Sequence, residues 1–222
     1  MAEHATALPA TGSAERRHGP GVERRMHRSP DGPTANGAAP NGTASAAAAE
    51  ASGAAGTRPD GGVTDIDGAR FRAVLGRFAT GVVAITGIDA GSGRPTGLAA
   101  NSFTSVSLDP PLVAFCVAHT STTWPRLRDA GRLCINILSE PQLEVCKRLA
   151  LKGGDKFADI TWTGSPGGGP VIEGALAWIE VSVENEHVAG DHVIVVARVH
   201  HLDKHHEGEP LLFYKGAYGS FA

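Results

Sequence analysis

The chain has 222 residues, of which 41% are hydrophobic and 19% are charged, and its formal net charge is −3. This composition argues against a nucleic-acid-binding protein, because basic residues are not in excess and few aromatic side chains could stack on bases. No apolar run approaches the length of a membrane-spanning helix, so we expect no membrane partner. Cys116, Cys134 and Cys146 lie in apolar stretches without CxxC spacing. This favours buried, reduced thiols in a cytoplasmic protein.

Residues 1–62 differ in composition from the rest of the chain. They are dominated by Ala, Gly, Pro, Thr, Glu and Arg and contain almost no large apolar side chain. Such a segment cannot bury enough surface to offset its chain entropy, so we predict a disordered tail. The arginine pairs at 16–17 and 24–25 precede no apolar segment and therefore do not indicate export. The folded part is expected over residues 63–222, as one domain.

A helix is predicted at the start of the folded part. Thr64 and Asp67 have the spacing of a capping box, and Gly81 is expected to end the helix. Apolar residues recur at helical spacing between them and form a stripe. The stripe consists of Phe71, Val74, Leu75 and Phe78. Residues 82–86 are β-branched and predict a strand, and residues 87–95 predict a turn.

The stretch at 97–111, GLAANSFTSVSLDPP, is the centre of the predicted site. Its first half is small and polar, so a flat ligand could lie against its backbone. Residues 103–108 alternate as a strand does, the prolines end that strand, and the apolar run at 112–117 fits a partner strand. The hairpin would present hydroxyls and the amide of Asn101 to phosphate or ring carbonyl oxygens. An ordinary hairpin rich in Ser and Thr is the alternative.

Two further segments have the composition of a phosphate site. HTSTT at 119–123 precedes a short predicted helix, in which Ser121 or Thr122 would be the cap and Pro125 lies in the first turn. A helix start rich in hydroxyls suits an anion, although a plain cap explains it equally well. KGGDKF at 152–157 combines glycines with lysines, which can approach a phosphate, and a solvated loop is the alternative.

The remaining chain predicts mostly strands. Residues 132–138 read as a strand, and Ser139 with Gln142 opens a helix. Residues 164–170 are expected to form a flexible loop. Residues 177–186 alternate, with Ile179, Val181 and Val183 predicted inward and Glu180, Ser182 and Glu184 outward. A turn at 190–192 and strands at 193–202 and 211–214 complete a pattern typical of an antiparallel barrel with peripheral helices.

Several motifs occur in an order that resembles a known family. They are FRxxLGRFATGVVAIT at 71–86, GLAANSFTSVSLDPPLV at 97–113, NIL at 136–138, AGDH at 189–192 and PLLFYKGAY at 210–218. From residue 71 to residue 218 the chain resembles the flavin reductase family of two-component monooxygenase systems. The resemblance implies a mainly β fold with peripheral helices, an antiparallel Greek-key split β-barrel that binds FMN and forms a homodimer. It does not extend to the tail.

The resemblance also implies site residues. The flavin ring is expected to lie against Ala99, Ala100, Asn101, Ser102 and Phe103, with Ser105 and Val106 continuing the site. The phosphate end is expected at Thr120, Ser121 and Thr122, where some relatives carry lysines, and the flavin tail near Lys152 and Gly153. The nicotinamide side is expected at His192, as the catalytic residue, and at Lys215, Gly216, Ala217 and Tyr218.

The implied activity is reduction of free FMN or FAD by NADH or NADPH. A hydride would pass to flavin N5, and the reduced flavin would diffuse to a separate oxygenase component. The alternative is a non-catalytic flavin-binding or electron-carrier protein of the same fold, which would have no need of His192 on the open face of the ring. No metal is expected, because a histidine group lacks carboxylate or thiolate partners at ligand spacing. That group is His200, His201, His205 and His206.

Overall fold

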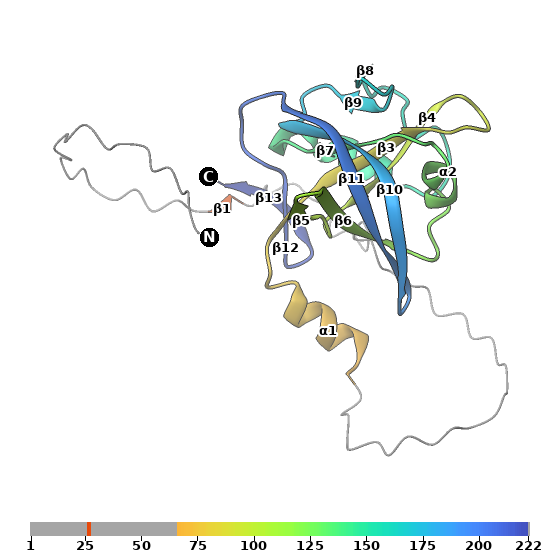
Figure 1. The fold of residues 1–222 in the computed structure, drawn as a ribbon. Helices are drawn as coiled ribbons and strands as arrows, with labels where there is room; N and C mark the ends of the chain where they lie inside the picture. Colours follow the sequence, from red (N-terminus) through yellow and green to blue (C-terminus); the bar gives the residue numbers. More distant parts are fainter. Residues whose placement is uncertain (1–25, 28–65, 222) are drawn as a thin grey trace, which may run out of the picture.

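The structure is a computed structural model that describes residues 26–27 and 66–221 (Figure 1). The tail predicted over residues 1–62 lies outside the described residues, apart from β1 (Met26–His27), which pairs antiparallel with the last strand of the chain. The described chain is mainly strand, with short helices at its periphery, as the sequence predicts. The helices are α1 (Gly68–Leu75), α2 (Trp124–Arg128), the 3-10 helix η1 (Glu140–Gln142) and α3 (Leu143–Ala150).

Seven strands within residues 66–221 form one antiparallel sheet, in the order β4-β3-β7-β10-β11-β6-β5. They are β3 (Val83–Ile88), β4 (Pro95–Ala100), β5 (Thr104–Leu108), β6 (Pro111–Ala118), β7 (Leu133–Ile137), β10 (Ala177–Ala189) and β11 (His192–Lys204). The two edge strands, β4 and β5, follow each other in the chain, so the segment between them joins the two edges of the curled sheet (Figure 1). This curled antiparallel sheet is the predicted split β-barrel.

Smaller sheets complete the structure. β2 (Thr80–Gly81), β12 (Leu212–Tyr214) and β13 (Ala217–Phe221) join β1 in the order β1-β13-β12-β2, and β8 (Trp162–Gly164) pairs with β9 (Pro170–Ile172). The sequence analysis did not predict β13. A tight turn makes it possible, because Lys215 and Gly216 have φ angles of 50° and 76°, in the left-handed region.

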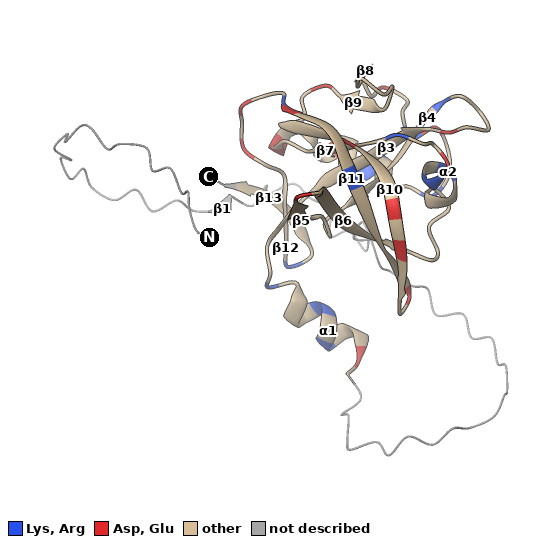
Figure 2. Cartoon of the chain, in the orientation of Figure 1, with Lys and Arg blue, Asp and Glu red and all other residues tan. Residues whose placement is uncertain are grey.

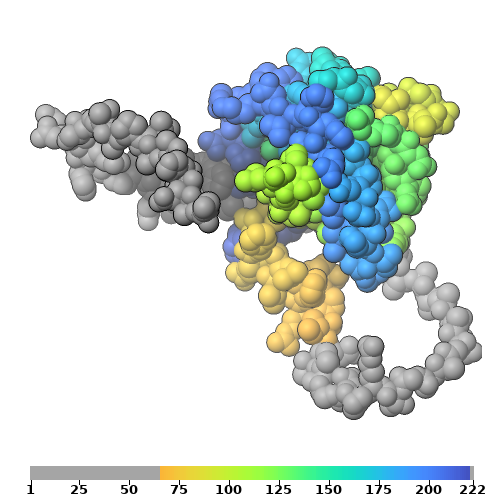
Figure 3. Space-filling model, viewed as in Figure 1, coloured from red at the N-terminus to blue at the C-terminus, as the bar shows by residue number. Residues whose placement is uncertain are grey.

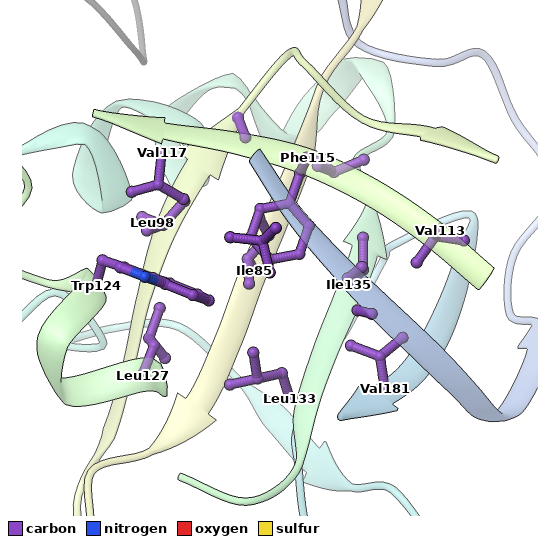
Figure 4. Close-up of a cluster of buried hydrophobic side chains, with 14 residues drawn as sticks. Ile85, Leu98, Val113, Phe115, Val117, Trp124, Leu127, Leu133, Ile135 and Val181 are labelled. Atoms are coloured by element: carbon purple, nitrogen blue, oxygen red, sulfur yellow. The ribbon is translucent and has the colours of Figure 1, made fainter. Parts of the chain in front are cut away.

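The main sheet separates two apolar clusters. Inside the curl, Trp124 meets Phe115 edge to face, with ring centroids 5.6 Å apart, beside Ile85 (Figure 4). On the other face, Ala84 belongs to a second cluster with Leu149 of α3. Neighbouring residues of β3 therefore pack into opposite clusters. Burial on both faces accounts for the continuous apolar run that predicted this strand.

Glu180 corrects the predicted alternation of β10. The sequence placed it on the solvent face, but it is 1% exposed. Its carboxylate accepts hydrogen bonds from Ser165 Oγ at 2.5 Å and from Gly167 N at 2.6 Å, and Arg132 Nε lies 3.7 Å away. Burial by itself would raise the pKa of Glu180, but these donors outweigh it and hold the pKa below its usual value. The segment 165–169 therefore covers a carboxylate that it also stabilises.

The first helix also differs from its prediction. Asp67 caps α1 by accepting hydrogen bonds from the amides of Ala69 and Arg70, both at 2.8 Å, and Thr64 lies outside the described residues. The helix ends at Leu75, not at Gly81, which belongs to β2.

The apolar stripe of α1 is not covered by the described chain. No residue of the helix is buried, and the stripe residues are 54% to 77% exposed. In the space-filling view α1 projects from the body of the molecule (Figure 3). Phe71, Val74 and Leu75 lie on α1 as predicted, whereas Phe78 lies beyond its end, and the described chain buries none of the four side chains.

Candidate functional site

The segment Asn101–Phe103, called here the joining segment, connects the two edge strands of the main sheet. Ser102 Oγ accepts a hydrogen bond from Cys116 N at 2.9 Å and donates one to Cys116 O at 3.2 Å, which fixes the segment to β6. Phe103 packs against the inner cluster. Asn101 is partly buried, and its side chain makes no hydrogen bond to any described residue. The joining segment therefore offers one unused amide, which suits the polar edge of a flat ring.

The residues on either side of the joining segment have different roles. Ala99 and Ala100 are 3% and 0% exposed and belong to opposite apolar clusters, so they can meet a ligand only through their backbone. Ser105 and Val106 lie exposed on β5. The pairing of β5 with β6 shifts between Ser105 and Ser107, and this irregularity breaks the predicted strict alternation.

The loop 119–123 follows β6 directly. Ser121 Oγ accepts a hydrogen bond from Trp124 N at 3.1 Å. The N-cap residue of α2 is Thr123, so the prediction of Ser121 or Thr122 at that position is wrong by one or two residues. Thr120 and Thr122 are exposed. The helix is also fixed from its far side, because Trp124 Nε1 donates to Glu186 Oε1 of β10 at 3.1 Å. The loop thus presents hydroxyls from an anchored helix start, close in the chain to the contact between Ser102 and β6.

The turn between β10 and β11 brings His192 to this loop. His192 lies opposite Ala118 in the pairing of β11 with β6, and His119 N donates to Asp191 O at 3.0 Å. His192 Nδ1 lies 2.7 Å from Asp191 Oδ1, and the hydrogen bond from His192 lowers the pKa of Asp191. With Nδ1 held by this carboxylate, Nε2 is the ring nitrogen available to a ligand.

The other predicted nicotinamide residues, 215–218, lie on the β12–β13 turn of the smaller sheet. Lys215 N donates to Gly76 O at 2.8 Å, and its ammonium lies 4.9 Å from the centre of the Tyr214 ring. Cys146 Sγ of α3 and Tyr218 OH are hydrogen-bonded at 3.5 Å. Burial raises the pKa of Tyr218 far above its usual value. Among the described residues no hydrogen bond joins this turn to His192.

The segment 152–157 contains a residue that the sequence analysis missed. Lys152 and Gly153 are exposed. Lys156 instead points inward, and its Nζ donates to Thr123 Oγ1 at 2.8 Å and to Leu149 O at 2.9 Å. No local pattern in the sequence indicated this contact, because Thr123 lies 33 residues from Lys156 in the chain.

Neither a metal centre nor a membrane helix is found in the described ranges. No group of three or more His, Cys, Asp or Glu side chains among residues 66–221 could hold a metal ion. Within the same residues, no helix combines the length and the apolar character needed to cross a membrane. The rings of His205 and His206 instead lie against each other, with centroids 4.5 Å apart.

Comparisons with known proteins show the family to which the chain is similar. Residues 75–222 match the family described as "Flavin reductase like domain". A flavin reductase of Pseudomonas putida is 50% identical over 157 residues, covering 71% of this chain and 92% of that protein. The reductase subunit HsaB of a flavin-dependent monooxygenase from Rhodococcus jostii (strain RHA1) is 48% identical, covering 69% and 77%. The solved structure of Streptomyces globisporus C-1027 NADH:FAD oxidoreductase SgcE6, in complex with NAD and FAD fragments, has a TM-score of 0.65 and 33% identity, covering 70% and 93%.

Proposed function

The chain belongs to the flavin reductase family and is an NAD(P)H:flavin oxidoreductase, and we propose that it reduces free FMN or FAD for a separate oxygenase component. The observation that carries this proposal is the joining segment between the two edge strands, where the Asn101 amide makes no hydrogen bond to a described residue. The name of the Rhodococcus relative, a monooxygenase reductase subunit, supports the delivery of reduced flavin to a partner.

The donor set of the site fits a flavin. A flavin, when bound, supplies a ring nitrogen that accepts the hydride, so the protein needs no nucleophile or general base. Asn101 can hydrogen-bond the polar edge of the ring. The Ser102 hydroxyl donates its proton to Cys116 O and uses one lone pair to accept from Cys116 N. Its second lone pair remains free to accept a hydrogen bond from the ring. The hydroxyls of residues 120–122 would hold the phosphate end.

His192 is proposed to bind and orient the nicotinamide. Asp191 fixes the imidazole through Nδ1, and the side chain of His192 is 23% exposed at the rim of the barrel. From this position Nε2 can hydrogen-bond the carboxamide of NADH or NADPH. Holding the donor carbon near the acceptor ring lowers the barrier through orientation, which is the principal contribution a protein makes to hydride transfer.

The assembly is proposed to be a homodimer in the cytoplasm. The exposed stripe of α1 supports association, because large apolar side chains that lie together on a surface mark an interaction site. A two-fold dimer would bury the same stripe in both copies. The buried, unbridged thiols of Cys134 and Cys146 and the use of a nicotinamide nucleotide support the cytoplasm.

Steady-state oxidation of NADH and NADPH, with FMN, FAD or riboflavin added in turn, tests the activity. We expect oxidation that depends on added flavin. In an anaerobic assay, reduced flavin should also pass through a filter that retains the protein. Flavin binding without nicotinamide oxidation would favour the carrier. Reduced flavin that stays with the protein would contradict delivery by diffusion.

A further inference from the structure

The end of β13 has a strand partner that comes from the N-terminal tail. Ala217–Gly219 pair with β12, whereas Ser220 and Phe221 extend beyond that pairing. These two residues lie opposite His27 and Met26 of β1, in the sheet order β1-β13-β12-β2 (Figure 1). Backbone N–H and C=O groups of a strand need hydrogen-bond partners, and β1 offers them to this end of β13.

β12 does not reach this end of β13. The residue before β12 is Leu211, and both of its backbone groups are engaged with other parts of the chain. Leu211 N donates to Leu138 O at 2.9 Å, and Leu211 O accepts from Val82 N at 3.1 Å. The pairing of β12 with β13 therefore stops at Gly219. Within residues 26–27 and 66–221, β1 is the strand that pairs with Ser220 and Phe221.

β13 also lacks the features that usually protect the edge of a sheet. Its sequence, AYGSF, contains neither a charged residue nor a proline (Figure 2). Charged side chains, prolines and covering segments keep other strands from adding to an edge, and an edge without them pairs readily with extended backbone. The sequence around β1 supplies these residues, because Arg24, Arg25, Arg28 and Pro30 flank its two residues. Adding β1 therefore gives the sheet an outer strand that is flanked by charges and a proline.

We propose that the outer edge of β13 is a strand-acceptor site and that Met26–His27 of the same chain occupy it by strand addition. Residues 28–67 join β1 to α1, so this docking is intramolecular and does not depend on protein concentration. The occupied edge is then closed to strands of other copies. The inference goes beyond the proposed function and does not depend on it, and it gives the arginine-flanked segment of the tail a role.

A disulfide between the two strands tests the docking. Paired residues of antiparallel strands have Cα atoms about 4.5–5.5 Å apart, which a disulfide can span. Met26→Cys combined with Phe221→Cys should therefore form an intrachain disulfide on mild oxidation, found by peptide mapping of the single-chain species. Ala47→Cys combined with Phe221→Cys is the matched control, with the first thiol elsewhere in the tail, and it should react about tenfold more slowly. Equal rates would overturn the proposal. A disulfide that joins two chains would also overturn it, because the tail would then dock on a second copy.

Hydrogen exchange gives a second measurement, in which no bond is trapped. Successive residues of a strand direct their N–H groups to opposite sides, so replacing both Met26 and His27 by Pro removes whichever N–H faces β13. Exchange in the pair Ser220–Phe221 should become about five- to tenfold faster, the effect of one lost hydrogen bond, while the main sheet is unchanged. Replacing Ala47 and Ala48 by Pro should leave the exchange of this pair as in the parent. The same exchange in all three proteins would contradict the docking.

An unoccupied edge should accept strands from other copies. Sedimentation velocity of the protein without residues 1–62, at rising concentration, should show species larger than those of the parent at the same concentrations. Met26→Pro with His27→Pro in the full chain should show them too, since the edge is open in both. Distributions that match the parent at every concentration would show that the edge of β13 is not a strand acceptor, and the proposal would be wrong.

Discussion

The hydroxyl of Ser102 is bonded to both backbone groups of Cys116, accepting from its amide and donating to its carbonyl. Ser102 therefore fixes the joining segment to β6. Its neighbour Asn101 has no such engagement among the described residues. The two adjacent polar residues are thus expected to respond differently to substitution.

Replacing Asn101 by Ala should lower flavin affinity by about two- to tenfold, the effect of one lost hydrogen bond, with little change in melting temperature. Replacing Ser102 by Ala should instead destabilise the fold by about 1–2 kcal/mol, because the amide and carbonyl of Cys116 lose their partner. Flavin titration and thermal unfolding of both variants check this. An unchanged flavin affinity in Asn101→Ala would remove Asn101 from the site.

Replacing His192 by Ala should lower kcat/KM for the nicotinamide substrate by about tenfold, since one positioning hydrogen bond is lost. Flavin affinity should be unchanged, because in the proposed function the imidazole binds the other substrate. Kinetics with saturating FMN and varied NADH give the answer. A variant that matches its parent with both nicotinamides would show that His192 is structural and would strengthen the carrier alternative.

Replacing Leu75 by Glu should convert a dimer to a monomer, because a charge would be placed in the apolar stripe of α1. Sedimentation velocity measures the change. Leu151→Glu is the matched control, since Leu151 is also exposed, at 60%, but follows α3. A parent that sediments as a monomer at every concentration, with full activity, would contradict the dimer.

The buried carboxylate of Glu180 should make the protein sensitive to acid. The pKa of Glu180 is lowered in the folded state, so the unfolded state binds the proton more readily. The ionised carboxylate therefore stabilises the fold fully at pH values above the usual pKa of glutamate. That contribution is lost as pH falls from the unfolded pKa through the lower folded value. Glu180→Gln should therefore be less stable than the parent near neutral pH, and the difference should shrink in acid. Urea unfolding at several pH values measures it.

Gly167→Ala tests the same contact without changing a charge. A Cβ at Gly167 would lie 2.7 Å from Glu180 Oε1, whereas a Cβ at Gly164 would meet nothing within 4 Å. We expect Gly167→Ala to cost about 1–3 kcal/mol of unfolding free energy and Gly164→Ala much less. Equal stabilities would show that the segment 165–169 does not hold the carboxylate.

Deleting residues 1–62 should leave the melting temperature and turnover almost unchanged, as the composition of this segment predicts. The deletion removes β1, so the outer edge of β13 loses its two paired residues. Hydrogen exchange should therefore increase at Ser220 and Phe221 and nowhere in the main sheet. A large loss of activity would instead show that the tail completes the site.

Local features of the structure could be predicted from the sequence because their partners are close in the chain. Ser139 and Gln142 form the predicted capping box, and the strands around the joining segment pair as expected. Glu180 could not be predicted, since its donors lie 13 to 15 residues away and alternation alone puts it in solvent. Lys156 was missed for the same reason, because its partner Thr123 is 33 residues distant. The helical spacing of apolar residues also predicts which residues share a face of α1, but it does not predict what covers that face.

The exposed stripe of α1 has a consequence for how the helix itself is held. The helix has eight residues, and isolated helices shorter than about 12–15 residues are marginal in water. No residue of α1 is buried, and just beyond its end Gly76 O accepts a hydrogen bond from Lys215 N. In the proposed dimer, the surface that covers the stripe would supply helical order in this segment, so folding of α1 and association would be one equilibrium. On dilution the helical circular dichroism signal should fall before the sheet signal does, which makes α1 a reporter of assembly.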